Sequence, residues 1–253
     1  MKPTRNTILI TGGGSGIGRG LAEALQKQGN QVVIAGRRKE VLEQTAAANP
    51  GMKFLTLNIE DPKAIQEFAA QVEKEFPALN VLVNNAGIMR VENLMERPDL
   101  ADAESMVVTN LLGPIRLTTA LLPLLRKQPQ ATVMNVSSGL AFVPLASTPT
   151  YCATKAAMHS YSCSLRYQLK DTAIEVVEII PPYVQTDLLG GGAEDPRAMP
   201  LKDYIVQTME IFNQQPTPQE NCVQNAQGLR TAESKGQFDA VFKGLNDAMA
   251  GIH

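Results

Sequence analysis

The chain has 253 residues, of which 44% are hydrophobic and 19% are charged. This composition is ample for a buried core and excludes an intrinsically disordered chain. The formal net charge is −2 and no block of Lys and Arg stands out, which argues against a dedicated nucleic-acid or anionic-membrane surface.

Membrane and export signals are not expected either. No apolar run approaches the about 18 residues that a membrane span needs. Only residues 8–10 are apolar before a glycine cluster, so no signal-peptide core is predicted. Cys152, Cys163 and Cys222 form no C-x-x-C pair. They fit a reduced compartment, the cytoplasm, as small buried hydrophobes, with a lone reactive cysteine as the alternative.

Short hydrophobic runs alternate with longer amphipathic stretches. Near-continuous apolar runs are typical of buried parallel strands, and they predict strands at 7–11, 31–35, 53–57, 80–83, 131–136 and 174–180. The stretches between them predict helices at about 17–28, 38–48, 62–76, 102–126 and 150–170. This alternation predicts an α/β fold, a Rossmann-like doubly wound parallel sheet with helices on both faces, and a single domain over residues 1–253.

The segment after the last predicted strand has a different composition. Residues 187–200 are rich in Gly and Pro. We expect a mobile loop at the carboxyl edge of the sheet, where such folds bind ligands, and assign residues 187–215 to a substrate-loop region. Residues 201–250 are predicted to be helical.

A glycine cluster follows the first strand, and its sequence can be compared with three known loop motifs. A Walker A loop ends in Gly-Lys-Ser/Thr, whereas Gly18 precedes Arg19. A nucleophile elbow centred on Ser15 would need glycine at position 17, and G-x-G-x-x-G fits no register. The letters fit T-G-x-x-x-G-x-G instead. Between a strand and a helix, this pattern predicts a dinucleotide phosphate cradle rather than a merely flexible turn. Its residues are Gly12, Gly14, Ser15, Gly16, Ile17 and Gly18.

The end of the second strand indicates which dinucleotide binds. An NAD site places a carboxylate there to hold the ribose hydroxyls. Here Arg37 and Arg38 stand in that place, and the first carboxylate is Glu40. Arginine suits a 2′-phosphate, so we predict NADP(H), with Arg37 as main contact and Arg38 as support. The alternative is a solvated basic turn.

Tyr151 and Lys155 open a predicted helix with i, i+4 spacing, which puts both side chains on one face. A tyrosine hydroxyl has an ordinary pKa of about 10, too high for a base at neutral pH. A neighbouring ammonium stabilises the phenolate, so the pair suits proton exchange with a carbonyl or an alcohol.

Together these motifs resemble the short-chain dehydrogenase/reductase family, over roughly residues 5–190. The motifs that carry the resemblance are T-G-x-x-x-G-x-G through Gly18, Asn84-Asn85-Ala86-Gly87, Asn110, Asn135-Val136-Ser137-Ser138 and Tyr151-x-x-x-Lys155. The resemblance implies an oxidoreductase that transfers hydride between NADPH and a ketone or aldehyde, or the corresponding alcohol.

The resemblance also implies a role for each matching residue. Tyr151 is the general acid/base, Lys155 holds the nicotinamide ribose and acidifies Tyr151, Ser138 bonds the reacting carbonyl, and Asn110 holds a relay water. Further cofactor contacts fall on Asn58, Ile59, Asn85, Ala86, Gly87, Pro181, Val184 and Thr186. Asn58 replaces the usual Asp and Pro182 the usual Gly, although the Asn58 amide oxygen still accepts a hydrogen bond.

Pro114 lies four residues after Asn110. Proline lacks the amide that would bond the Asn110 carbonyl in an α-helix. We hypothesise that this carbonyl is left free for a relay water and that the helix bends there; a packing kink alone is the alternative.

Two further residues receive structural interpretations. His159 is four beyond Lys155, and the only other histidine is His253, so a structural role is favoured over metal binding. Ser137 neighbours Ser138, and adjacent strand residues point to opposite faces, so only one of them can face the site.

The substrate is predicted to be apolar. Residues 139–145 carry no charge, and neither do Tyr183, Leu188 and Leu189 near the expected loop. We expect a pocket for a non-ionic carbonyl compound.

Residues 139–144 and the segment from Leu229 to Glu233 are similar to a bacterial subgroup of the family that is linked to lipoteichoic-acid D-alanylation operons. Many family members end in a strand used for tetramer contacts, whereas residues 238–249 have a helical pattern. A homodimer through helices 102–126 and 150–170 is therefore expected over a tetramer.

Two other classes of protein stay open. The first is a non-enzymatic NADP(H)-binding sensor on the same fold. Such relatives usually lose the Tyr or the Lys, which this chain keeps. The second is a structural or interaction protein, which the near-neutral charge does little to support.

Overall fold

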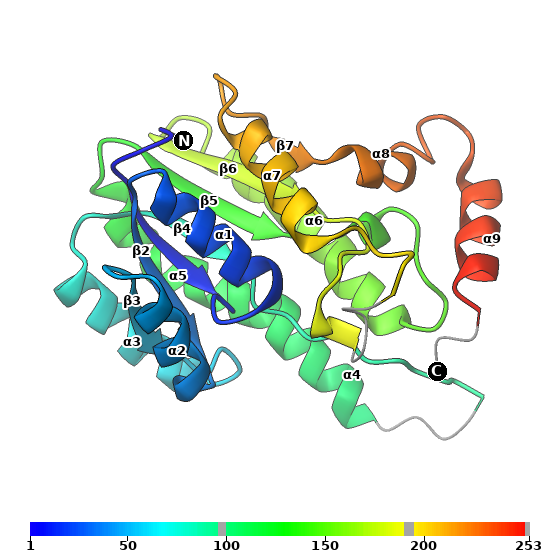
Figure 1. Ribbon diagram of the computed structural model, residues 1–253, viewed down its shortest axis with the longest axis horizontal. Coiled ribbons are helices and arrows are strands. Elements are labelled where there is room, and N and C mark those ends of the chain that lie inside the picture. Colours follow the sequence, from blue (N-terminus) through cyan, green and yellow to red (C-terminus); the bar gives the residue numbers. More distant parts are fainter. Residues whose placement is uncertain (96–99, 190–194, 251–253) are drawn as a thin grey trace.

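The computed structural model describes residues 1–95, 100–189 and 195–250. Within these residues, seven strands form one sheet in the order β3-β2-β1-β4-β5-β6-β7 (Figure 1). They are β1 (Thr7–Thr11), β2 (Gln31–Gly36), β3 (Lys53–Thr56), β4 (Leu79–Asn84), β5 (Ala131–Val136), β6 (Ile174–Ile180) and β7 (Glu220–Cys222). All neighbouring strands are parallel, which confirms the predicted doubly wound fold.

Helices cover both faces of the sheet. One face carries α3 (Pro62–Glu75), α5 (Gly113–Arg126) and α6 (Pro149–Gln168), whose apolar residues share a core cluster with the strands. A second cluster joins the sheet to α1 (Gly16–Lys27), α2 (Lys39–Ala48) and α7 (Leu201–Phe212). The chain ends with α8 (Gln224–Arg230) and α9 (Phe238–Ala248), and α9 stands at one end of the molecule (Figure 1).

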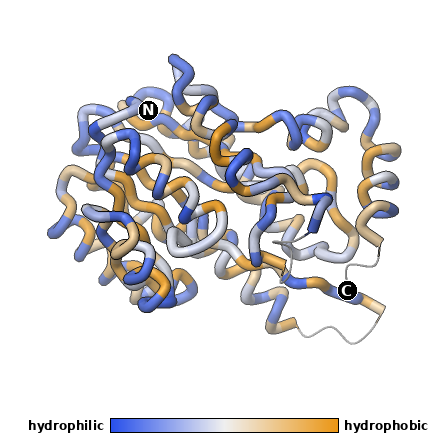
Figure 2. Tube along the Cα trace, viewed as in Figure 1, coloured by the Kyte–Doolittle hydropathy of each residue, from blue (hydrophilic) through white to orange (hydrophobic). Residues whose placement is uncertain are grey.

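Successive strand residues divide between the two clusters. Leu9 and Val33 belong to one cluster, whereas Ile8, Ile10 and Val32 belong to the other. This division follows from side chains that alternate across a strand. Figure 2 shows the resulting concentration of hydrophobic residues along the central strands.

The helix expected at 102–126 is longer and contains a wider turn. It runs through α4 (Leu100–Val107), the π-helical turn η1 (Val108–Leu112) and α5. By length and composition this helix could cross a membrane. Leu117, Leu121 and Leu125 lie in the core cluster, which accounts for its apolar character.

The expectation of helix throughout 201–250 is wrong between α7 and α8. There β7 adds a strand beside β6, with Glu220 paired with Glu178 in register. The strand has three residues and a polar sequence, Glu-Asn-Cys, so it lacks the apolar run that marks the other strands.

Part of the expected substrate-loop region 187–215 is regular structure. The short helix η3 (Asp187–Leu189) opens it and α7 occupies residues 201–212. Between them, Val184 and Met199 form an isolated parallel bridge. Residues 190–194, in the expected mobile loop, lie outside the described residues.

Asp61 is expected to contribute measurably to stability, because its carboxylate caps α3. It accepts hydrogen bonds from Lys63 N at 2.8 Å and Ala64 N at 3.3 Å. Asp61→Ala should lower the free energy of unfolding by about 1 kcal/mol, measured by urea denaturation. Asp61→Asn should retain most of that stability because asparagine caps as well. Equal losses in both variants would contradict the capping role.

Candidate active site

The candidate site lies where parallel strands end. The chain leaves β1, β2, β4, β5 and β6 at the same edge of the sheet, as their parallel pairing requires. Open α/β sheets bind ligands at this edge, beside the point where the strand order reverses. Here that point lies between β1 and β4, which are adjacent in the sheet.

Hydrogen bonds join the end of β1 to the end of β4. Thr11 Oγ1 accepts from the backbone N–H groups of Asn85 and Ala86, each at 3.0 Å. The Asn85 amide donates back to the Thr11 carbonyl at 2.9 Å. Thr11 stands in the glycine motif, but sequence reasoning did not assign it this bridging role.

Glycine is required where these two turns meet. Gly12 has φ +67°, and a Cβ added there would lie 2.9 Å from Asn85 Nδ2. A Cβ on Gly18 would lie 2.4 Å from the Gly12 carbonyl oxygen. The glycine loop therefore packs closely on both β4 and the start of α1.

The N-terminus of α1 is suited to an anion. Ser15 is its N-cap, but its hydroxyl accepts from Arg38 Nη2 at 3.2 Å and does not cap the helix. Among the described residues, no side chain caps the first N–H groups of α1 and no acidic residue stands in its first turn. These free N–H groups and the helix dipole fit a dinucleotide diphosphate. Gly14, Gly16 and Ile17 belong to this turn.

The two arginines predicted to bind a 2′-phosphate are exposed beside this cradle, although each has a partner. Arg37 Nη1 donates to Glu60 Oε1 at 2.9 Å, and Thr109 Oγ1 donates to the same oxygen at 2.8 Å. Arg38 reaches Ser15 instead. The Glu60 contact could not be predicted from local sequence, because 23 positions separate Glu60 from Arg37.

Asn58 and Ile59 follow β3 near Arg37. The Asn58 side-chain oxygen accepts from Glu60 N at 3.2 Å in a local turn. Ile59 is buried, and a Cβ on Gly113 would lie 2.6 Å from its Cγ1. Asn58 is thus the more accessible of the two predicted contacts.

Tyr151 and Lys155 lie on one face of α6, as their spacing predicts, and Ser138 lies beside Tyr151. Burial raises the pKa of Tyr151, while its hydrogen bond with the Ser138 side chain acts in the opposite direction. The Lys155 ammonium lies 5.5 Å from the centre of the Tyr151 ring. Burial lowers the pKa of Lys155 to about 8, and its Nζ donates to the Val136 carbonyl at 2.8 Å.

Asn110 connects α6, the helix that carries Tyr151 and Lys155, to the turn after β4. Its Nδ2 donates to the Ile88 carbonyl and its Oδ1 accepts from the Ile88 N–H, each at 2.8 Å. Its Nδ2 also lies 3.3 Å from Thr154 Oγ1 on α6. A Cβ on Gly87 would lie 3.3 Å from Asn110 Oδ1 and 3.7 Å from Lys155 Nζ, so glycine leaves room beside both.

The π-helical turn lies directly before Pro114. Within it, Gly113 N donates to the Val108 carbonyl, an i to i+5 bond. A wider turn at this point fits the missing Pro114 amide, and π-turns are frequent at functional sites. The free Asn110 carbonyl stays a prediction.

The residues after β6 lie close to the glycine loop. A Cβ on Gly16 would lie 3.3 Å from Thr186 Cγ2. The Pro181 carbonyl accepts from Gly139 N at 2.9 Å, which ties this segment to the turn after Ser138. Val184 is buried in an apolar cluster, so its side chain faces the protein core.

Ser137 points away from Tyr151, as strand alternation predicts, and joins a buried polar network. It donates to Glu178, whose other oxygen lies 2.7 Å from His159 Nδ1. His159, Glu178 and Glu220 place ligand atoms within 4.8 Å of one another. However, Arg230 holds both Glu220 oxygens at 2.8 Å, so a metal ion would have to displace its guanidinium.

Glu92 supports the start of α6, a role the sequence did not reveal. Its carboxylate accepts from Thr150 N at 2.9 Å and from Thr150 Oγ1 at 2.8 Å. A negative charge at a helix N-terminus is favourable, and this one holds the residue before Tyr151. The 58 positions between the partners left no local signal.

An apolar cluster surrounds Tyr151. Its buried members are Met89, Met106, Leu145, Tyr151 and Cys152. Partly buried residues from four segments pack against it: Ile88, Leu140, Leu189, Leu245 and Met249. We call these ten residues the Tyr151 cluster.

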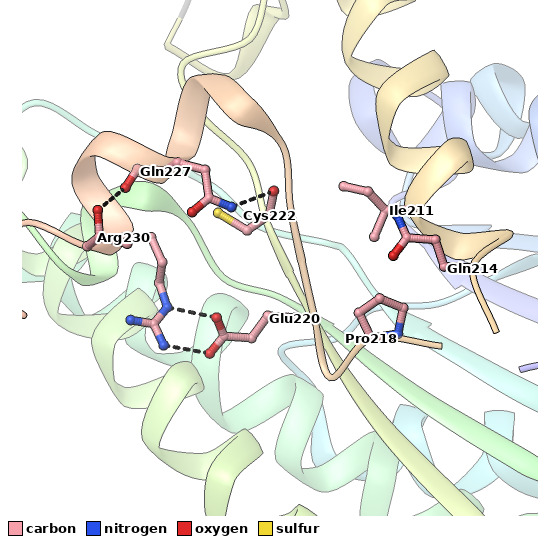
Figure 3. Close-up of a pocket in the computed structure, with 8 residues that line it drawn as sticks. Ile211, Gln214, Pro218, Glu220, Cys222, Gln227 and Arg230 are labelled. Carbon is pink, nitrogen blue, oxygen red and sulfur yellow. Dashed lines mark hydrogen bonds and ion pairs between the residues drawn. The ribbon is translucent and has the colours of Figure 1, made fainter. Parts of the chain in front are cut away.

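A separate hollow of about 420 Å³ lies between α7, β7 and α8 (Figure 3). Its lining includes Cys222, Gln227 and the Glu220–Arg230 ion pair. None of the predicted catalytic side chains lines it.

Comparison with known proteins assigns the family. The short chain dehydrogenase family matches residues 6–196. The chain is 37% identical over 252 residues to the protein named uncharacterized oxidoreductase DltE of Bacillus subtilis (strain 168), covering 97% of this chain and 98% of that protein. It is 32% identical over 187 residues to an NADP-dependent 3-hydroxy acid dehydrogenase of Schizosaccharomyces pombe, covering 72% of each.

A solved short-chain dehydrogenase from Streptomyces avermitilis superposes with a TM-score of 0.82 at 27% identity, covering 100% of both chains. The chain therefore belongs to the short-chain dehydrogenase/reductase family of oxidoreductases.

Burial of Lys155 has a measurable consequence for stability. Its pKa in the folded protein is about 8, below the ordinary lysine value. Above pH 8 the unfolded chain therefore binds more protons at this residue than the folded one, so stability contributed here rises with pH. Relative to Lys155→Met, the wild type should gain about 2 kcal/mol between about pH 7.5 and about pH 9.5, measured by urea denaturation at each pH. A difference that is constant with pH would contradict this account.

Proposed function

We propose that this protein is an NADP(H)-dependent reductase of hydrophobic ketones or aldehydes, which also catalyses the reverse oxidation of the alcohol. One observation carries the proposal: the buried Tyr151 hydroxyl meets Ser138 and lies beside Lys155, next to a glycine-lined edge that suits a dinucleotide.

The residues at the edge suit NADP(H). The free N–H groups at the start of α1 would hold the diphosphate, and Asn85, Ala86 and Gly87 would line the ribose. Arg37 and Arg38 would bind the 2′-phosphate, with Arg37 exchanging Glu60 for the phosphate. The NADP dependence named for the Schizosaccharomyces pombe relative supports this choice.

Bound NADPH supplies the hydride, and the protein's own residues handle the proton. A raised pKa keeps the Tyr151 phenol protonated at neutral pH, so it can donate to the carbonyl oxygen. Ser138 would bond the same oxygen, which orients the carbonyl and stabilises the charge that develops on it. The nearby Lys155 ammonium favours the phenolate that remains.

Asn110 would complete the proton path. Its side chain is fully engaged with Ile88 and Thr154, so it fixes the π-turn against the turn after β4. We propose that its carbonyl holds a water that returns protons towards Lys155.

The Tyr151 cluster favours an uncharged substrate. Its ten residues are all apolar except for the Tyr151 hydroxyl and the Cys152 thiol, and burial raises the pKa of that thiol. A charged group would lose its hydration there without gaining a partner. We further propose a cytoplasmic homodimer that packs through α5 and α6.

Tyr151→Phe tests the proposal directly. It removes only the hydroxyl, so turnover of NADPH with hydrophobic ketones and aldehydes should fall by about a hundredfold to ten-thousandfold. NADPH affinity should be unchanged, measured by titration calorimetry. Wild-type protein that binds NADPH tightly but reduces no carbonyl compound, and oxidises no alcohol, would favour a sensor instead.

The preference for NADP(H) over NAD(H) is tested by substituting Arg37 and Arg38. Arg37→Ala and Arg38→Ala should each weaken NADPH binding by about tenfold to a hundredfold, because each removes a charge-assisted hydrogen bond to the 2′-phosphate. NADH binding should not change. The neighbouring cation Lys39, which pairs with Glu43 at 3.5 Å, provides the matched control Lys39→Ala. Equal affinity of the wild type for NADH and NADPH would overturn the assignment.

A further inference from the structure

Arg37 is paired with a carboxylate at the place where the 2′-phosphate of NADP(H) would bind. Its Nη1 lies 2.9 Å from Glu60 Oε1, and the two side chains are 52% and 29% exposed. Ion pairs this exposed are weak, so a phosphate can displace the carboxylate from Arg37. In doing so it approaches a second negative charge. Glu60 therefore acts on any anion that binds to Arg37.

The Glu60 carboxylate is also held from the side opposite Arg37. Thr109 Oγ1 donates to the same carboxylate oxygen at 2.8 Å, and Thr109 is buried in the π-turn η1. The preceding residue, Ile59, is buried, and a Cβ on Gly113 would lie 2.7 Å from its carbonyl oxygen. The turn after β3 thus packs closely on the end of η1. The carboxylate therefore keeps its place when the exposed Arg37 side chain moves.

The charges at this place determine how Glu60 acts on the two cofactors. A phosphate monoester carries about −1.5 to −2 charges at neutral pH. A guanidinium that contacts both anions would hold the phosphate and the carboxylate roughly two charge-assisted hydrogen bonds apart, where like charges still repel each other. Both this repulsion and the competition for Arg37 weaken binding of the phosphate. NADH has a neutral 2′-hydroxyl, which neither meets the repulsion nor takes Arg37 from Glu60.

We propose that Glu60 is a specificity-determining residue that limits how strongly the protein prefers NADPH to NADH. The two arginines favour the phosphate, and the carboxylate fixed between Arg37 and η1 opposes it. NADPH stays the preferred cofactor, but by a smaller factor than Arg37 and Arg38 alone would give. This inference rests on the proposed function, because it concerns the NADP(H) site proposed there.

Glu60→Gln tests this role, because it removes the charge and keeps a side-chain oxygen for Thr109. Its affinity for NADPH should rise by about threefold to tenfold, measured by titration calorimetry without a carbonyl compound. Its affinity for NADH should stay within about twofold of the wild-type value, since no second anion is present. Asp61→Asn is the matched control, because it removes the neighbouring carboxylate charge while asparagine still caps α3. This control should change NADPH affinity by less than about twofold.

Ionic strength provides a second readout. Because the effect is one of charge, the gain in Glu60→Gln should be larger at about 0.05 M than at about 0.5 M salt. A gain that came from altered packing alone would not depend on salt. Unchanged or weaker NADPH binding in Glu60→Gln, a gain equal to that of Asp61→Asn, or a gain independent of salt would overturn the proposal.

Failure of this proposal can be told apart from failure of the cofactor assignment. If Arg37→Ala weakens NADPH binding but Glu60→Gln does not strengthen it, only the role of Glu60 is wrong. If the wild type binds NADH and NADPH equally and Arg37→Ala changes neither, the phosphate does not bind at Arg37, and both proposals are overturned. Neither result requires reduction of a carbonyl compound, so the role of Glu60 is judged on binding even if no turnover is found.

Discussion

Parallel pairing of the strands is the constraint on which the candidate site depends. It forces the chain to leave β1, β4, β5 and β6 at one edge, and the intervening helices return it to the opposite edge each time. The turns that contain Gly12, Asn85 and Ser138 therefore lie along one edge of the sheet, although long stretches of sequence separate them. Thr11 then fixes the β1 and β4 turns to each other by hydrogen bonds to two backbone N–H groups.

Burial shifts the pKa values of two neighbouring groups in opposite directions. Low polarity disfavours charge on both Tyr151 and Lys155, so it raises one pKa and lowers the other. The two ordinary pKa values are nearly equal, so these opposite shifts move them apart, and burial favours the neutral form of both groups. The same burial destabilises the fold, and the bond from Lys155 to the Val136 carbonyl offsets part of that effect. The Lys155 ammonium therefore bears both on the stability of the fold and on the proposed proton transfer.

Much of this architecture could be predicted from the sequence, since strands such as β1, β2 and β6 are rich in Val, Ile and Leu and the glycine motif directly follows a strand. What could not be predicted has a common cause. The polar strand β7 is stabilised by pairing with β6 and not by its own pattern. Glu92 on Thr150 and Glu60 on Arg37 join positions far apart in the chain, and a carboxylate gives no local sign of its partner. Local periodicity shows which face is buried, whereas long-range polar contacts appear only in the folded chain.

The exposed placement of α9 also bears on how such an enzyme can change. Residues that hold Tyr151, Ser138 and Lys155 are buried in the sheet and its two helical layers, where a substitution disturbs the packing of many neighbours. A helix whose every residue stays partly exposed tolerates replacement at a smaller loss of stability. Substitutions at the exposed positions of α9 therefore disturb few neighbours, whereas substitutions beside Tyr151, Ser138 and Lys155 disturb many. The C-terminal helix is thus a part of this fold whose sequence is free to diverge.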